Sequence, residues 1–257
     1  MKKTTGTRLI AGLIFFAAVI YGLWYFNSGL SSLLESGNTL PVRALRIDGD
    51  LTHVTKRQVA DIVGRIAGGH NIASVDTAQV REALLDNPWI ARVAVHRKMP
   101  DTLEVSLVEH VPAAYWNNDG LYDAQNKEIF KPSLANFAEP LVRLGAYRDN
   151  LAPEVYESAV AFIRILQKSK YHMVALYLDQ VRCYTITLSG GTKLILGRGR
   201  EIGEQRLERL LKSLPLTDIK LVDVSYIDLR YDVGFAVGPM KNTQEGERKN
   251  DDSVPQE

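Results

Sequence analysis

The first clear pattern along the chain is a long apolar run near its beginning. Residues 9–26 form an uncharged stretch of eighteen residues that follows a short basic start. A helix of this length rises about 27 Å, which is close to the hydrocarbon thickness of a bilayer. Tyr21, Trp24 and Tyr25 lie at its far end, where aromatic rings favour the membrane interface. The pattern predicts a transmembrane helix over residues 9–27.

A cleavable signal peptide is the competing interpretation of this run. Signal peptides have a similar basic start, but their apolar core usually spans about 7–15 residues. The stretch Phe26-Asn27-Ser28-Gly29-Leu30 also offers no convincing small-x-small cleavage site. We therefore predict an uncleaved, single-pass anchor. Because basic residues mark the side that stays cytoplasmic, we expect residues 1–8 in the cytoplasm and the bulk of the chain across the membrane.

Residues 42–112 follow a linker at residues 28–41 and alternate between strand and helix patterns. Thr55 and Gln58 form a capping box ahead of apolar positions at helical spacing, and two glycines end that helix. Asp76 begins a second, shorter helical stripe. Strand patterns occupy residues 42–48, residues 90–98 and the alternating positions 103–107. The predicted order of this domain is β-α-α-β-β.

Residues 113–239 predict a second, β-rich domain with flanking helices. A hairpin signal lies near its start, and Pro153 suits the first turn of a helix. Two strands flank Ser189-Gly190-Gly191, a leucine-rich helix follows, and residues 222–237 read as one long strand. Residues 240–257 contain a single aliphatic side chain and are predicted to be disordered. The fold class is α+β.

Composition changes this picture little, but it excludes some classes of function. The net charge is +1, with 46% hydrophobic and 24% charged residues, so nothing in the balance indicates nucleic acid as a partner. The chain has one cysteine, Cys183, which excludes an intramolecular disulfide and a cysteine metal cluster. Cys183 lies in a strand pattern, and we expect it to be structural.

We find no catalytic, metal-binding or cofactor-binding pattern in the sequence. The five histidines are scattered, and none forms a ligand pair on a helix face. No serine lies in a Gly-x-Ser-x-Gly turn. Gly197-Arg198-Gly199 through Gly203 resembles a phosphate-binding turn, but its spacing departs from the dinucleotide pattern. We interpret it as a strand-exit loop.

The predicted strand at residues 222–237 is a better candidate for function, through partner binding. Ile227, Leu229 and Tyr231 alternate with Asp228, Arg230 and Asp232, which gives one apolar and one charged face. A terminal strand at a sheet edge could accept an added strand from a partner. It could equally be an ordinary edge strand protected by its own charges. The basic strand at residues 92–98 leaves the same two interpretations open.

Several short motifs follow one another along both predicted domains. They are Asp86-Asn87-Pro88-Trp89-Ile90, Val93-Ala94-Val95-His96-Arg97-Lys98, Pro100-Asp101-Thr102-Leu103, Val108-Glu109-His110-Val111-Pro112-Ala113, Trp116-Asn117, Leu196-Gly197-Arg198-Gly199 and Tyr226-Ile227-Asp228-Leu229-Arg230-Tyr231-Asp232. In this order and spacing they resemble the FtsQ/DivIB family of bacterial cell-division proteins. The similarity covers nearly the whole chain, and the first domain resembles a POTRA domain.

The resemblance implies an inner-membrane, periplasmic scaffold of the division septum that binds FtsB and FtsL by strand addition and links early and late division proteins. It implies no enzymatic activity and no cofactor. Other divisome proteins would bind through the POTRA domain and the transmembrane helix. The implied partner-binding residues are Arg182, Arg230, Tyr231, Asp232, Val233, Gly234 and Phe235. A second implied surface on the POTRA edge comprises Val93, Val95, Arg97 and Lys98.

Two residues depart from the family pattern around the implied strand-addition site. Val233 stands where a small polar residue is common in relatives, and Pro239 replaces an aromatic residue. Simple alternation also places Tyr231 on the same face as Leu229, so either the strand bulges there or Tyr231 lies half covered at the rim.

Two other classes of protein are alternatives to the scaffold. A periplasmic cell-wall enzyme would need paired carboxylates or a nucleophile with a base, and the scattered acids show no such constellation. A POTRA-based export accessory protein normally works with a β-barrel of many amphipathic strands, for which this chain has no room.

Overall fold

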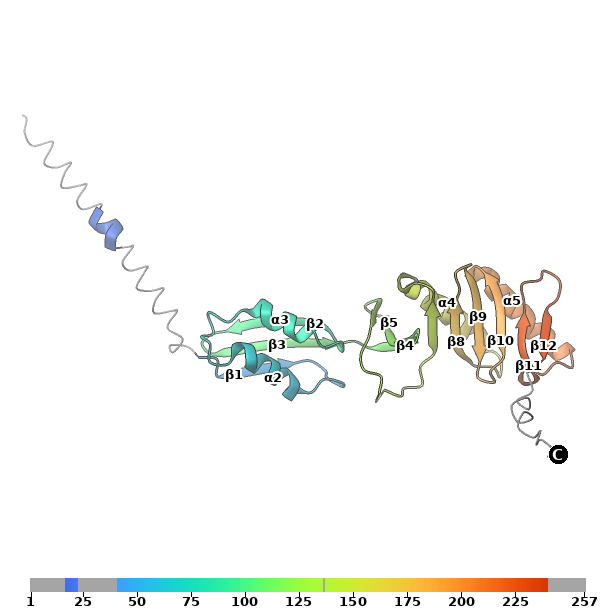
Figure 1. Ribbon diagram of the computed structural model, residues 1–257, viewed down its shortest axis with the longest axis horizontal. Coiled ribbons are helices and arrows are strands. Elements are labelled where there is room, and N and C mark those ends of the chain that lie inside the picture. Colours follow the sequence, from blue (N-terminus) through green and yellow to red (C-terminus); the bar gives the residue numbers. More distant parts are fainter. Residues whose placement is uncertain (1–16, 23–40, 136, 240–257) are drawn as a thin grey trace, which may run out of the picture. The chain divides into compact units, whose positions relative to one another are not determined.

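The computed structural model describes residues 17–22, 41–135 and 137–239 of the chain. Contacts divide the chain into two compact units, residues 1–110 and 111–257 (Figure 1). Residues 17–22 are helical, and no helix within the described ranges is both long and apolar enough to cross a bilayer. The rest of the predicted anchor, nearly all of the predicted linker and the predicted tail at residues 240–257 lie outside the described residues.

The first unit is a three-stranded sheet with two helices, and its element order confirms the predicted β-α-α-β-β pattern. Strand β1 is parallel to the central strand β3, and β2 is antiparallel to it, which gives the sheet order β1-β3-β2. The elements are β1 (Ala44–Asp48), α2 (Lys56–Ala67), α3 (Thr77–Leu85), β2 (Ile90–Lys98) and β3 (Thr102–Glu109).

Local signals in the sequence set the helix ends of this unit. Thr55 and Gln58 form the predicted capping box at the start of α2. The carboxylate of Asp76 accepts hydrogen bonds from two backbone N–H groups at the start of α3. The apolar faces of both helices pack on the sheet around Val59, Val80, Leu84, Leu103 and Val105, all of which are fully buried.

Glu109, at the end of β3, fastens the loop that precedes α2. Its carboxylate accepts hydrogen bonds from the backbone N–H groups of Thr52, His53 and Val54. The shortest N···O distance from each of these groups is 2.7–3.0 Å. Burial raises the pKa of Glu109, but these hydrogen bonds outweigh burial and hold the pKa below its usual value. The ring of His53 stacks on Trp89, with centroids 3.6 Å apart.

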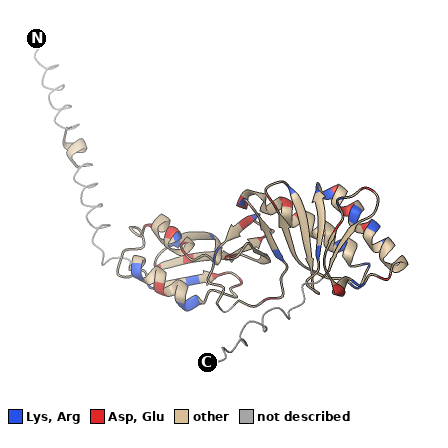
Figure 2. Ribbon diagram, turned by 45° about the vertical axis from the view of Figure 1, so that its right-hand side comes forward, with Lys and Arg blue, Asp and Glu red and all other residues tan. Residues whose placement is uncertain are grey.

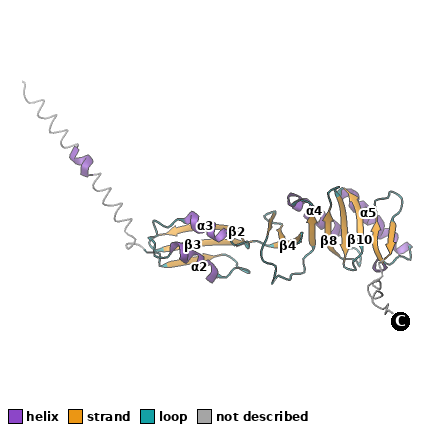
Figure 3. Cartoon of the chain, in the orientation of Figure 1, coloured by secondary structure: helices purple, strands orange, loops and turns teal. Residues whose placement is uncertain are grey.

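The second unit is a nine-stranded mixed sheet with the order β12-β11-β10-β9-β8-β7-β4-β5-β6 (Figures 1 and 3). Its strands are β4 (Pro112–Trp116), β5 (Gly120–Asp123), β6 (Glu128–Phe130), β7 (Arg143–Ala146), β8 (Met173–Leu178), β9 (Cys183–Leu188), β10 (Lys193–Arg198), β11 (Val224–Asp228) and β12 (Ala236–Pro239).

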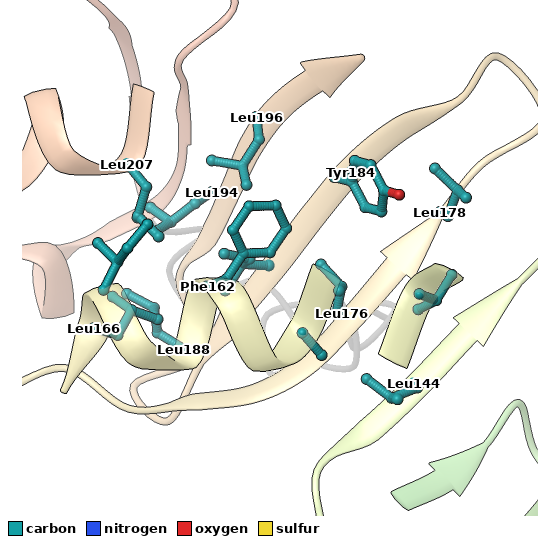
Figure 4. Packing of buried hydrophobic residues seen from close by; sticks show 14 of the residues in the cluster. Leu144, Phe162, Leu166, Leu176, Leu178, Tyr184, Leu188, Leu194, Leu196 and Leu207 are labelled. Carbon is teal, nitrogen blue, oxygen red and sulfur yellow. The ribbon is translucent and has the colours of Figure 1, made fainter. Parts of the chain in front are cut away.

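Helices α4 (Ala152–Leu166) and α5 (Arg200–Ser213) pack against this sheet and against each other. Pro153 lies in the first turn of α4, as its fixed φ and missing N–H favour. Alternate residues of the central strands are buried beneath the helices, and Figure 4 shows Phe162 of α4 among Leu176, Leu194 and Leu196. This core corresponds to the mixed, helix-flanked β domain expected from the sequence.

The single long strand predicted at residues 222–237 is wrong. A short 3₁₀ turn at Leu221–Asp223 comes first, β11 ends at Asp228, and the chain returns as β12 in the opposite direction. The alternation continues past Asp228 in the sequence, but after Leu229, whose N–H still donates to the carbonyl of Ile195 in β10, the carbonyls of residues 230–232 are held by side chains of α5. Leu229 is fully buried whereas Tyr231 is 54% exposed, which agrees with one of the two alternatives, that Tyr231 lies half covered at the rim.

Candidate functional site

The candidate site is the edge of the second sheet formed by β12 and the loop that precedes it. Among residues 41–135 and 137–239, β12 pairs with β11 on one side only and ends the strand order. Its four residues are uncharged, so it lacks the lysines that often protect an edge. A Cβ added to Gly238 would lie 2.1 Å from Cε1 of Tyr226, so the tyrosine ring covers the strand where only glycine fits.

The loop over residues 229–235 presents an aromatic side chain beside this edge. Leu229 is fully buried, and its N–H donates to the carbonyl oxygen of Ile195 at 2.9 Å, which fixes the start of the loop. Tyr231 is 54% exposed and Val233 is 96% exposed. Gly234 has a φ of +105°, a conformation that favours glycine, and Phe235 packs against the core. Two apolar side chains are therefore left facing solvent.

Two arginines of α5 hold this loop through its backbone. Arg206 donates to the carbonyl oxygens of Leu196 at 2.6 Å and of Arg230 at 2.9 Å. Arg209 donates to the carbonyl oxygens of Tyr231 and Asp232, each at 2.7 Å. Residues three apart on a helix lie on the same side, so one face of α5 supplies both guanidinium groups. Three successive carbonyls of the loop are thus tied to one helix.

Arg230 is fixed by the carboxylate of Asp228. Nε and Nη2 of Arg230 donate to Asp228 at 2.9 Å and 2.7 Å, which is a bidentate arrangement. This side-chain hydrogen bonding lowers the pKa of Asp228 and raises the pKa of Arg230. Both groups remain charged at neutral pH. The two hydrogen bonds to Asp228 fix the orientation of the Arg230 guanidinium at the end of the sheet.

Arg182 lies at the same end of the sheet and is also paired. It lies in the turn before β9 with a φ of 66°, and its Nη2 donates to Oε1 of Glu154 at 2.7 Å. The hydroxyl of the buried Tyr184 donates to the same oxygen at 2.9 Å. The hydrogen bond to Glu154 raises the pKa of Arg182. Because Cys183 pairs with Arg198 in the sheet, Arg182 and Arg198 extend a basic rim beside Arg230.

The second predicted surface lies on β2, an outer strand of the first unit. Val93 and Val95 are half-buried and pack against the core of that unit. Arg97 donates from Nε and Nη2 to the carbonyl oxygen of Val75, at 3.1 Å and 2.6 Å. Lys98 is exposed at the end of the strand. Of the four predicted residues, Val93 and Val95 pack inward, whereas Arg97 and Lys98 are exposed near the end of the strand.

Comparison with known proteins identifies the family. A model for the POTRA domain of FtsQ type matches residues 40–110, and a model for the C-terminal region of cell division protein FtsQ/DivIB matches residues 114–230. The cell division protein FtsQ of Aliivibrio fischeri is 30% identical over 249 residues, which cover 94% of this chain and 93% of that protein. The chain belongs to the FtsQ family. FtsQ of Nitrosospira multiformis is 36% identical over 77% of this chain and 83% of its own length, and FtsQ of Escherichia coli is 28% identical over 95% and 91%.

The candidate site lies at the end of the range that the C-terminal family model matches. The C-terminal family model ends at residue 230, so Tyr231, the rest of the loop and β12 lie just beyond the matched range. The structure brings six of the predicted residues together in this loop, Arg230 to Phe235, and places Arg182 at the same end of the sheet. Sequence reasoning missed Arg206, Arg209 and Arg198. The spacing of Arg206 and Arg209 on a predicted helix was the available signal, but it does not reveal what the helix faces.

Proposed function

We propose that this FtsQ protein is a non-enzymatic scaffold of the divisome. In this proposal it is anchored in the inner membrane by residues 9–27, with its two domains in the periplasm, and it binds FtsB and FtsL at the septum. It thereby links early and late division proteins. The observation that carries the proposal is the outer edge of β12, which no other described strand pairs with, which is uncharged and which lies beside the exposed Tyr231.

The proposed mechanism is strand addition. Main-chain groups on the outer side of β12 pair with an extended segment of the partner and set its register. Tyr231 supplies aromatic area that the partner buries, as interface anchors commonly do. Arg182 and Arg230 lie at the sheet end, already oriented by Glu154 and Asp228, and interact with acidic groups of the partner. Charges at an interface rim mainly affect register and association rate.

A second contact through the POTRA domain is part of the same proposal. There the accessible feature is the outer edge of β2, with Arg97 and Lys98 at its end. Since Val93 and Val95 pack inward, we expect any partner to bind the main chain of β2 more than these two side chains.

The test compares Tyr231→Ala with a matched control in full-length protein held in detergent. Tyr177→Ala removes a similarly exposed tyrosine, 47% against 54%, from the open face of β8. Affinity for the purified periplasmic segments of FtsB and FtsL should fall about 10- to 100-fold for Tyr231→Ala, as for an aromatic anchor, and stay unchanged for the control. Circular dichroism should be the same for all three proteins. Unchanged binding by Tyr231→Ala would place the site elsewhere, and no binding by the wild type would refute the assignment of these partners.

A further inference from the structure

The second unit has a groove that the strand-addition site does not use. It lies between the end of α4, the turn that follows it, the end of α5 and the segment 214–222, and its volume is about 820 Å³. Its floor is aliphatic and consists of Ile165, Leu211, Leu214, Ile219 and Leu221. Val222, which is 58% exposed, also lines the groove, and Leu216, which is 87% exposed, follows the lining residue Pro215, so both extend the apolar surface toward solvent.

Lysines surround this apolar floor. Lys168, Lys170, Lys212 and Lys220 line the groove, and Glu208 is the one acidic residue among its lining residues. Within the described part of the chain none of the four forms an ion pair, whereas Arg182 and Arg230 at the sheet end are each paired with a carboxylate. Figure 2 shows that acidic and basic residues are otherwise interspersed along the ribbon. The groove therefore has an excess of positive charge, four lysines against Glu208, around an apolar floor.

Helix-end electrostatics account for only part of this arrangement. A lysine in the last turn of a helix stabilises the helix dipole, which explains Lys212 in α5. Lys168 and Lys170 lie beyond the end of α4, and Lys220 precedes a 3₁₀ turn. Three elements thus direct lysines to one groove, although their own secondary structure does not require it.

We propose that this groove binds an amphipathic helix of a partner protein, with carboxylates on both sides of an apolar stripe. The charge of the four lysines selects acidic flanks, and the aliphatic floor takes side chains spaced at i, i+3, i+4 and i+7. A strand does not suit the groove, because its walls are helix ends and turns and the carbonyl of Leu221 is already bound by the hydroxyl of Thr192. This site is independent of strand addition at β12.

The shape of the groove favours a helix over a lipid surface. Ile165, Leu214 and Leu221 are at most 8% exposed, so the floor is recessed below the lysines. A flat bilayer surface would reach the lysines but not the floor, whereas leucine side chains of a helix would fill it. The exposed Val222 in the lining, and Leu216 next to Pro215, then add apolar surface for the same helix.

The test measures fluorescence anisotropy of labelled model helices with the full chain in phosphatidylcholine nanodiscs, against empty nanodiscs. One peptide carries leucines at i, i+3, i+4 and i+7 with flanking glutamates. A second has lysines in place of the glutamates, and a third keeps the glutamates but has scrambled leucines. We expect preferential binding of the first peptide, weakened by salt because exposed charges are screened.

Two groove variants and one control separate the outcomes. Reversing the four lysines to glutamate should weaken binding about 1.4- to 5-fold for each ion pair removed, and Glu208→Lys should strengthen it within the same range. Tyr231→Ala should bind the peptide like wild type, so failure of strand addition leaves this result unaffected. Equal binding of the first and second peptides, or no effect of either groove variant, would overturn the proposal. Lysine-dependent binding to phosphatidylglycerol vesicles without peptide binding would replace the helix by a lipid surface.

Discussion

Replacing Arg209 by alanine should weaken partner binding at β12 without unfolding the domain. Arg209 is half-buried on α5, and its guanidinium is hydrogen-bonded to the carbonyls of Tyr231 and Asp232. Alanine is a better helix former than arginine, so α5 itself should persist. What is lost is the attachment of the loop that presents Tyr231.

The size of the effect follows from the two hydrogen bonds. Each contributes about 0.5–1.5 kcal/mol net, and partial exposure places them toward the lower end, so together they favour the ordered loop by about 1–2 kcal/mol. If the partner binds only the ordered loop, the dissociation constant rises by the factor by which that conformation is depleted. A difference of 1 to 2 kcal/mol corresponds to a rise in the dissociation constant of about 5- to 30-fold. This is the largest loss of affinity that we expect from Arg209→Ala.

Two measurements on the same protein check this reasoning. Amide hydrogen exchange over residues 229–235 of the free chain should become faster in Arg209→Ala, while exchange in the core strand β9 should not change. Affinity for the FtsB–FtsL segments should fall within the stated range. Arg209→Lys, which can reach one carbonyl, should give an intermediate result. Arg164→Ala removes an exposed arginine from α4 and is the matched control. Faster exchange with unchanged affinity would show that the order of the loop does not matter for binding.

Two further predictions concern the Glu109 carboxylate in the first unit and the close approach of Gly238 and Tyr226 in the second. Glu109→Gln sets an amide N–H against a backbone donor and should destabilise the first unit by about 1–3 kcal/mol, measured by hydrogen exchange of β2 and β3 at pH 7. Because folding lowers the pKa of Glu109, its stabilisation is fully present above its usual value of about 4.3 and is lost as the pH falls through the lower value of the folded protein. The wild type should therefore approach the mutant in acid, and a difference that does not shrink as the pH falls would exclude the carboxylate as its source. Gly238→Ala should displace the ring of Tyr226 and destabilise the β11–β12 hairpin by about 1–2 kcal/mol, seen as faster exchange in β12. Gly190→Ala, in a turn where an added Cβ would make only an ordinary contact with Val222 at 3.5 Å, should leave β12 unaffected.

The elements that the sequence predicted well are those set by local signals. The capping box at Thr55, the N-cap at Asp76 and the proline at the start of α4 all act within one helical turn, and the structure has each of them. The nucleotide-like turn at Gly197 is also a strand exit, as interpreted, with α5 beginning directly after Gly199. For such elements, the residue pattern and its physical cause lie in the same short stretch.

The parts that sequence reasoning missed depend on distant partners. β7 has four residues, and it is a strand because it lies in parallel register between β4 and β8, which no local pattern shows. The alternation from Ile227 to Asp232 looked like a strand, yet beyond Asp228 the carbonyls bind arginines more than twenty positions earlier in the chain. Alternation of side chains cannot show which groups form hydrogen bonds with the backbone N–H and C=O groups.

The way α5 holds the loop has a consequence for specificity at the candidate site. Arg206 and Arg209 bind carbonyl oxygens, which every residue has, so they fix the path of residues 230–232 whatever side chains stand there. Tyr231 and Val233 can therefore change with little effect on folding, and their exposed side chains are available to a partner. In the proposed strand addition, the two roles would lie on different residues: α5 would determine the shape of the loop, and the exposed side chains of the loop would determine which partner it binds. Loss of partner binding can then arise from a substitution in α5 that never touches the partner.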